Sequence, residues 1–325
     1  MVQAIFVMSV LFVFYAYLGY PLALLIMSIF RNRPITKGDI TPCVSFIITA
    51  YNEEQRIGAK IDNTLKQDYP SDMLEIIVAS DCSTDRTDEI VKSYKSYGVR
   101  LVRASERRGK EAAQQLAVQS SAGAILVFSD VATTLPVDGV TNIVKNFYDP
   151  TVGCVSSVDR FIDEKGNVSG EGLYVRYEMW LRNLETAVNT VVGLSGSFFA
   201  ARREVCTQWA SNLQSDFNTL LNAAKLGLRG VSDPHSIGFY KNIADERREL
   251  ERKMRTVLRG ITVFMKSLPL LDPFRYKLFA WQLLSHKLAR WLVPFAMISA
   301  YLSNIVLVPQ SSLYAMSLFL QTSFY

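Results

Sequence analysis

The distribution of charge is the feature of this sequence that most constrains its fold. Residues 1–30 and 291–325 contain no Lys, Arg, Asp or Glu, and all 35 basic and 30 acidic residues lie between them. About a quarter of residues 31–290 are charged, which is an ordinary value for a soluble domain. The chain is therefore expected to fold as a soluble domain between two apolar ends.

The first apolar end is long enough to cross a bilayer. About 20 residues span the hydrocarbon core, and residues 4–30 carry no charge. A cleaved signal peptide, the alternative, would have a shorter apolar core, with basic residues before it and a small-residue cleavage site after it. Arg31, Arg33 and Lys37 follow directly, and the positive-inside rule then predicts an external N-terminus and a cytoplasmic middle.

The other apolar end predicts a second span that starts at Trp291. Residues 311–325 are too few to cross comfortably, so they are either the start of a third span or a segment in the interface. Residues 274–294, FRYKLFAWQLLSHKLARWLVP, mix basic and aromatic side chains at the start of this span. This composition is typical of amphipathic helices that lie in the membrane interface.

Composition excludes several classes of site. The net charge of +5 is mild and predicts no nucleic-acid partner. Four scattered cysteines without CxxC spacing indicate reduced thiols. His235 and His286 are too few and too far apart in the sequence for a zinc site.

The charged middle alternates β-rich and helical patterns. Apolar runs predict strands at 44–50, 74–80, 99–104 and 124–130, and helical spacing follows at 53–67, 84–97 and 109–123. Ser83 or Thr84 is a plausible cap for the second of these helices. This alternation predicts an α/β fold with a mostly parallel sheet covered on both faces.

Polar residues follow three of these strands. Tyr51 and Glu53 come after the first, Asp81 after the second, and Asp130 ends the fourth. Ligands of such sheets bind beyond the carboxyl ends of the strands, so these residues predict a binding site. The alternative is that the two Asp side chains only cap the next turn. No GxGxxG follows the first strand and Gly109-Lys110 lacks the rest of a P-loop, which argues against both motifs.

Seven ordered segments resemble family 2 glycosyltransferases with the GT-A fold, in particular the membrane-bound bacterial type related to polysaccharide synthases. The segments are VSFIITAYNEE, EIIVASDCSTDRTDEI, GKEAAQQLAV, FSDVATTLP, GLSGSFFAARRE, SDFNTLLNAAKLGLRGVSDP and SHKLARWLVPF. They extend from about residue 44 to residue 295. The resemblance implies transfer of a sugar from a UDP-sugar to a polysaccharide or lipid-linked acceptor, with inversion at the anomeric carbon.

The resemblance also implies which residues hold the nucleotide. Thr49, Tyr51 and Glu53 would line its pocket. Asp81 would accept a hydrogen bond from the uracil, and Lys110 would lie near the nucleotide.

Other residues are implied in the chemistry. Asp130 would reach the ribose or hold Mg²⁺ or Mn²⁺ on the diphosphate, and Asp216 would take the proton of the acceptor hydroxyl. Arg255 or Arg259 would neutralise the leaving diphosphate. Without the resemblance, Asp216 would be interpreted as a helix N-cap, and the basic segment around Arg255 as a helix on anionic lipid headgroups.

The sequence departs from the family pattern at three places. Ala132 replaces the usual second metal acid, and Ser215 replaces a frequent acid before the base. Thr256 stands where processive members carry the Trp of Gln-x-x-Arg-Trp. We interpret the first as a variant metal site, because Mg²⁺ often keeps several waters and few protein ligands. The missing Trp leaves chain elongation open.

The predicted organisation has four parts: a transmembrane helix at 1–30, a cytoplasmic GT-A domain at 31–250, interfacial helices at 251–290 and a transmembrane region at 291–325. Together they predict a multi-pass protein of the cell inner membrane. Two alternatives remain. One is transfer of a single sugar to a polyprenyl phosphate, and the other is a catalytically weak nucleotide-binding subunit of an export complex.

Overall fold

The computed structural model of the chain describes residues 1–162, 172–241 and 246–324. The chain divides into two compact units. Residues 33–270 form one unit, and residues 1–32 together with 271–325 form the other. The boundary near residue 32 lies close to the point at which the uncharged N-terminal run ends.

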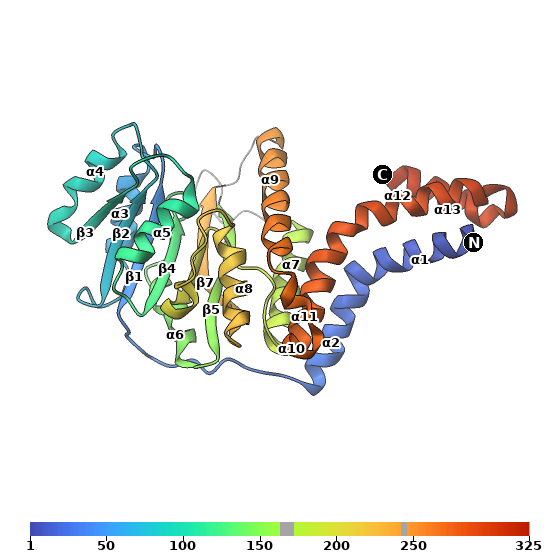
Figure 1. Cartoon of the computed structure of the whole chain (residues 1–325), viewed down its shortest axis with the longest axis horizontal. Helices are drawn as coiled ribbons and strands as arrows, with labels where there is room; N and C mark the ends of the chain where they lie inside the picture. Colours follow the sequence, from blue (N-terminus) through green and yellow to red (C-terminus); the bar gives the residue numbers. More distant parts are fainter. Residues whose placement is uncertain (163–171, 242–245, 325) are drawn as a thin grey trace. The chain divides into compact units, whose positions relative to one another are not determined.

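The larger unit is built around a seven-stranded sheet (Figure 1). Its strands are β1 Val44–Ala50, β2 Leu74–Ser80, β3 Val99–Arg103, β4 Ile125–Asp130, β5 Val152–Ile162, β6 Phe198–Arg202 and β7 Arg229–Lys241. Their order across the sheet is β3-β2-β1-β4-β6-β5-β7. β6 runs antiparallel to both of its neighbours and the other pairs are parallel. The predicted α/β fold with a mostly parallel sheet is confirmed.

Helices follow the strands of this unit. They are α3 Ile57–Leu65, α4 Thr87–Ser93, α5 Lys110–Ser120, α6 Gly139–Lys145, α7 Leu173–Val188, α8 Ser215–Lys225 and α9 Glu246–Met265. α5 packs on β1, β2 and β3, while α6, α7 and α8 pack on β7. Successive side chains of β1, β2 and β4 are buried. A strand buried on both faces needs such a continuous apolar run, which explains why these strands were predicted with the correct limits or within one residue.

Two predicted helices begin later than their sequence pattern indicates. Residues 53–56 precede α3 in a turn, because the backbone N–H groups of Glu53 and Glu54 donate to Thr87 Oγ1 and Asp85 Oδ2. The predicted cap of α4 at Ser83 or Thr84 is wrong. Thr84 N donates to the side chain of Asn52, and the carboxylate of Asp85 accepts the N–H of Thr87 at the start of α4. Contacts between the two loops therefore override the local helical pattern.

The smaller unit contains the apolar ends of the chain. Its helices are α1 Val2–Phe14, α2 Tyr20–Phe30, α10 Pro273–Tyr276, α11 Leu278–Leu283, α12 Ala289–Leu307 and α13 Ser312–Phe324. Short π-helical segments at Tyr15–Gly19 and Leu284–Leu288 join α1 to α2 and α11 to α12. Two continuous helices, Val2–Phe30 and Leu278–Gln310, are long and apolar enough to cross a membrane by length and composition. The second begins well before Trp291.

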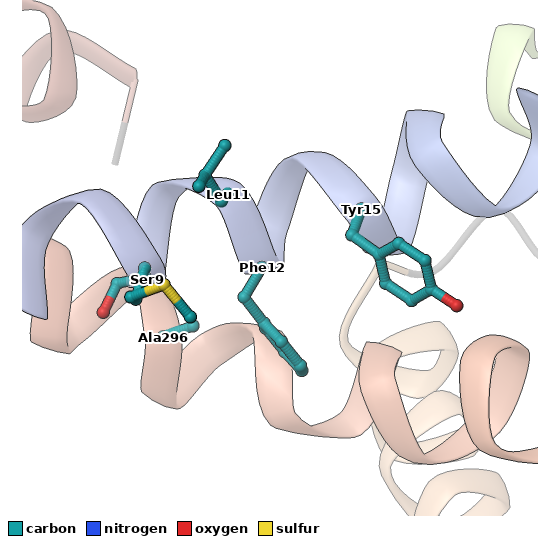
Figure 2. A pocket seen from close by; sticks show the side chains of 6 residues that line it. Ser9, Leu11, Phe12, Tyr15 and Ala296 are labelled. Atoms are coloured by element: carbon teal, nitrogen blue, oxygen red, sulfur yellow. The ribbon is translucent and has the colours of Figure 1, made fainter.

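α1 packs along α12 within this unit. Phe12 and Val13 of α1 pack there against a small buried cluster of Ala16, which follows α1, and Ala289 and Val293 of α12. Figure 2 shows an apolar groove beside it, lined by Ser9 and Phe12 of α1 and Ala296 of α12 among others. Polar groups pair across the unit, since Tyr15 OH lies 2.7 Å from Ser285 Oγ and accepts from the indole of Trp281 at 3.0 Å.

Candidate active site

A cavity of about 820 Å³ lies in the larger unit, beyond the carboxyl ends of its central parallel strands. Side chains from α3, α5, α8 and α9 line it together with the ends of β4 and β5 and the loop before β6. Its charged lining residues are Arg56, Lys60, Lys110, Glu111, Asp130, Asp159, Asp216, Arg252 and Arg259. The cavity therefore collects charged groups of both signs from distant parts of the sequence.

Asp130 ends β4 at the edge of this cavity. Its Oδ1 lies 2.5 Å from Lys110 Nζ, and 40% of its side chain is exposed. Its backbone N–H donates to Ser197 O at 2.9 Å. The last residue of β4 is thus fixed by the loop before β6, while its carboxylate lines the cavity and pairs with a cation.

Lys110 is the first residue of α5 and lies between several acids. Its ammonium donates to Asp130 and also to Gly196 O at 3.1 Å. Burial alone would lower its pKa, but the carboxylates of Asp130, Asp216 and Glu111 together raise the pKa above its ordinary value. Lys110 is therefore a cation at neutral pH.

Asp216 lies in the first turn of α8 and is 9% exposed. The N-cap position belongs to Gln214, whose side-chain amide donates to Asp216 Oδ2 at 3.2 Å. A Cβ added to Gly196 would lie 3.2 Å from the same oxygen. The glycine lets the loop before β6 approach the carboxylate, and Asp216 does not occupy the cap position that the alternative interpretation required.

Lys60 is a cavity residue that the sequence patterns did not reveal. It is 3% exposed, and its ammonium donates to Ser129 Oγ at 2.7 Å and Thr133 O at 2.6 Å, on either side of Asp130. Burial lowers its pKa to about 7, partly opposed by the charge of Asp130. The sequence did carry one signal of this burial. Lys60 lies in the apolar stripe of α3, three residues after Ile57 and beside Ile61.

Asp159 of β5 is a second acid that sequence patterns did not reveal. Its carboxylate accepts hydrogen bonds from the hydroxyls of Ser195 and Ser197, each at 2.6 Å, and from Ser157 at 3.3 Å. Burial raises its pKa more than these hydroxyls and Arg182 lower it. The three serines hold this carboxylate beside the loop that also contacts Asp130 and Lys110.

α9 contributes basic residues to the cavity. Arg259 Nη2 lies 2.5 Å from Oε1 of Glu111, and Glu111 follows Lys110 directly in the sequence. Arg252 and Thr256 also line the cavity. Arg255, the residue that matches the family's Arg, is exposed and does not line it. Of the two arginines considered from the sequence, the structure brings Arg259 to the site.

Of the residues predicted to hold the nucleotide, Lys110 lines the cavity. The other four, Thr49, Tyr51, Glu53 and Asp81, lie at or just beyond the ends of β1 and β2, outside the cavity lining. Thr49 pairs with Asp130 across the β1–β4 register, and its buried hydroxyl has no hydrogen-bond partner among the described residues. The guanidinium of Arg107 lies 3.9 Å from the ring centroid of Tyr51. Glu53 pairs with Arg56 at 2.7 Å.

Asp81 has protein partners at the same edge of the sheet. It is 4% exposed and accepts the backbone N–H groups of Arg108 and Gly109, each at 2.9 Å. These bonds fix the loop that precedes α5. Asp81 therefore helps to position Lys110.

The chemistry of the donor set tests whether the site fits a divalent metal ion. Across residues 1–162, 172–241 and 246–324, no three His, Cys, Asp or Glu side chains form a metal-ligating group. Asp130 offers one partly exposed carboxylate, and Ala132 lines the cavity nearby. One carboxylate with phosphate oxygens and waters suits Mg²⁺ or Mn²⁺. The residues fit a metal ion held jointly with a diphosphate.

The sequence is similar to those of known glycosyltransferases. The profile of "Glycosyl transferase family 2" matches residues 45–209. A beta-monoglucosyldiacylglycerol synthase of Nostoc sp. is 26% identical over 184 residues, 54% of this chain and 39% of that protein. A poly-beta-1,6-N-acetyl-D-glucosamine synthase of Staphylococcus aureus is 25% identical over 208 residues, 62% of this chain and 49% of that protein. The matches thus span less than half the length of these curated relatives.

A solved structure superposes on nearly the whole chain. The mannosyltransferase PcManGT from Pyrobaculum calidifontis, in complex with GDP-Man and Mn²⁺, superposes with a TM-score of 0.82 at 25% identity. The superposition covers 99% of this chain and 91% of that one.

The family profile covers just over half of the chain and includes both Lys110 and Asp130. The α/β unit that carries them has the same fold as a solved glycosyltransferase. The chain therefore belongs to glycosyl transferase family 2, and its larger unit is a glycosyltransferase domain of the GT-A fold.

Proposed function

We propose that this protein is a membrane-anchored, inverting glycosyltransferase that moves a sugar from a UDP-sugar to a saccharide or lipid-linked acceptor in polysaccharide biosynthesis. One observation carries the proposal. Asp216 lines the same cavity as the Lys110–Asp130 pair. A carboxylate for the attacking group and a cation for the leaving group therefore face one space.

The reaction needs a base on one side of the anomeric carbon. The acceptor oxygen forms a bond to that carbon while the bond to the diphosphate oxygen breaks, and Asp216 takes the proton of the acceptor hydroxyl. Asp216 is suited to this role because Gln214 orients one of its oxygens and Gly196 leaves space beside it. Direct displacement from one side inverts the anomeric centre.

The leaving diphosphate carries the negative charge that develops during transfer. Lys110 and Arg259 are the cations that would face it, and both now pair with cavity acids. Asp130 would hold Mg²⁺ or Mn²⁺ together with the diphosphate oxygens, and the bound ion would neutralise part of that charge. Thr49, Tyr51, Glu53 and Asp81 would lie along the nucleoside.

Membrane attachment is proposed from three features. The helices Val2–Phe30 and Leu278–Gln310 have the length and composition of spans. Arg31, Arg33 and Lys37 follow the first one and favour a cytoplasmic larger unit, at the inner membrane of a bacterial cell.

The third feature is the exposed apolar stripe of α9. Its large exposed side chains recur at helical spacing and are Leu250, Met254, Val257, Leu258 and Met265. Basic residues such as Lys253 and Arg255 alternate with them. An amphipathic helix of this kind suits a membrane interface, where it would keep the cavity close to a lipid-borne acceptor.

A second donor is supported by one comparison. The mannosyltransferase whose structure matches nearly the whole chain was solved with GDP-Man and Mn²⁺. A GDP-sugar is therefore the alternative donor for the same inverting chemistry.

The test is nucleotide release by the full chain in lipid nanodiscs. A panel of UDP- and GDP-sugars is offered with a membrane extract as acceptor, with and without Mn²⁺ or Mg²⁺. Release from one donor that stops on chelation supports the proposal and identifies the donor. Product sizing then separates elongation from transfer of one sugar to a polyprenyl phosphate. Nucleotide binding without release from any donor contradicts it and favours the nucleotide-binding subunit.

Asp216→Asn tests the base directly. The change keeps the shape of the side chain and should lower kcat by about 10² to 10⁴. Asp138→Asn is the matched control, because Asp138 is exposed at the start of α6 and outside the cavity. Unchanged turnover by a folded Asp216→Asn variant would remove Asp216 from the mechanism.

A further inference from the structure

Lys110 occupies a place in the cavity where the family resemblance expects a metal ion. Its ammonium contacts Asp130 Oδ1 at 2.5 Å and Gly196 O at 3.1 Å. It also interacts electrostatically with Asp216 and Glu111. Without any ligand, Asp130 already has a resident counter-ion supplied by the chain.

The residues around Asp130 disfavour binding of a second cation to the protein alone. Two lysines lie near this carboxylate, Lys110 in contact with it and Lys60 bonded to residues on both of its sides. Ala132 provides no second carboxylate, and the described ranges contain no group of three metal-ligating side chains. A divalent ion would meet one engaged carboxylate, the Lys110 ammonium and, in its protonated form, the Lys60 ammonium, and like charges at short range repel.

A diphosphate changes this balance. It brings several anionic oxygens into a cavity that already holds Lys110 and Arg259. An ammonium pairs well with phosphate oxygens, and Asp130 is then available to share a metal ion with them.

We propose that Lys110 is the resident counter-ion of Asp130 and that Mg²⁺ or Mn²⁺ joins the site only together with the nucleotide diphosphate, when the Lys110 ammonium pairs with a phosphate oxygen. This inference deepens the proposed function and rests on it. Lys110 then pairs first with Asp130 and afterwards with a phosphate oxygen, and the nucleotide itself is a required ligand of the metal ion.

The test measures metal and nucleotide binding apart from activity. Free Mn²⁺ is titrated by electron paramagnetic resonance against the full chain in nanodiscs, alone and with saturating UDP or GDP. The nucleotide should tighten Mn²⁺ binding by at least about tenfold, which corresponds to about 1.4 kcal/mol. Equal Mn²⁺ affinity with and without a nucleotide that binds would overturn the inference.

Lys110→Met separates this role from a structural one, because the two ligands should respond with opposite signs. Without nucleotide, Mn²⁺ should bind at least about tenfold more tightly, since Asp130 has lost its counter-ion. Without metal, UDP or GDP should bind at least about tenfold more weakly. Lys66→Met is the matched control, because Lys66 is exposed after α3 and does not line the cavity.

Loss of both affinities together in Lys110→Met would contradict the exchange. If that variant does not fold, Lys110→Arg, which keeps the charge, and the wild-type titration with and without nucleotide decide the question. The Arg variant should keep the nucleotide requirement for Mn²⁺. A failure of the proposed function looks different, since the wild-type chain would then bind neither UDP nor GDP under any condition.

Discussion

Replacement of Lys60 by Met should make the stability of this protein respond differently to pH. Lys60 is 3% exposed, and burial lowers its pKa from 10.5 to about 7. The interval between these values corresponds to about 5 kcal/mol. This is the order of the cost of keeping the ammonium charged in the folded state, after its hydrogen bonds to Ser129 and Thr133 are included.

The sign follows from proton binding. Between pH 7 and 10.5 the unfolded chain keeps the Lys60 proton while the folded chain loses it, so the free energy of unfolding rises with pH in this interval. Below pH 7 both states hold the proton and the full cost applies. From pH 6.5 to 8.5 the wild type should gain about 2 kcal/mol relative to Lys60→Met, which lacks the titrating group.

The assay is chemical unfolding of both proteins as full chains in one detergent, at several pH values between 6.5 and 8.5. Met also leaves the Thr133 carbonyl without its ammonium donor, which shifts the curve by about 1 to 3 kcal/mol at every pH. Other titrating groups are common to both proteins and cancel in the difference. The Lys66→Met control should follow the wild type. Parallel curves for wild type and Lys60→Met would refute the reasoning that burial disfavours this charge.

Three further changes test single contacts. Arg259→Gln should lower kcat/KM by about tenfold or more, because it removes a charged group from the cavity, while Arg255→Gln should stay within about twofold; equal losses would show that lining the cavity does not decide the effect. Gly196→Ala should lower kcat more than KM, since the added methyl group would lie 3.2 Å from the Asp216 carboxylate; full kcat would show that this contact tolerates a methyl group. Gly123→Ala should destabilise the larger unit by about 3 kcal/mol in chemical unfolding, because its Cβ would lie 2.3 Å from a backbone nitrogen of β1; a smaller loss would mean that the strand can shift.

Local sequence patterns were sufficient to predict the limits of the four strands in the parallel half of the sheet, β1 to β4. β1 and β2 have the predicted limits, and β3 and β4 differ by one residue. A strand buried on both faces has to be apolar throughout, so its pattern survives in the sequence. The same reasoning placed Asp81 and Asp130 at one edge, because parallel strands present their carboxyl ends together.

Helix starts were decided by tertiary contacts. The loops after β1 and β2 exchange hydrogen bonds through Asn52, Asp85 and Thr87. In a longer helix, the N–H groups that make these bonds would lie in the first turn, where they have no partner within the helix. A single sequence does not show which of the two sets of partners is the more stable.

The candidate active site, too, was predicted only in part from the sequence. Asp130 was predicted from its place after a strand and from a family resemblance, whereas Asp216 and Lys110 were predicted from the resemblance alone. Only the tertiary structure places the Lys110 ammonium on Asp130, brings Arg259 rather than Arg255 to the cavity, and buries Lys60 in the cavity lining. Secondary structure is largely set by periodicity within one segment, whereas the pairing of charges depends on distances between segments that only packing fixes.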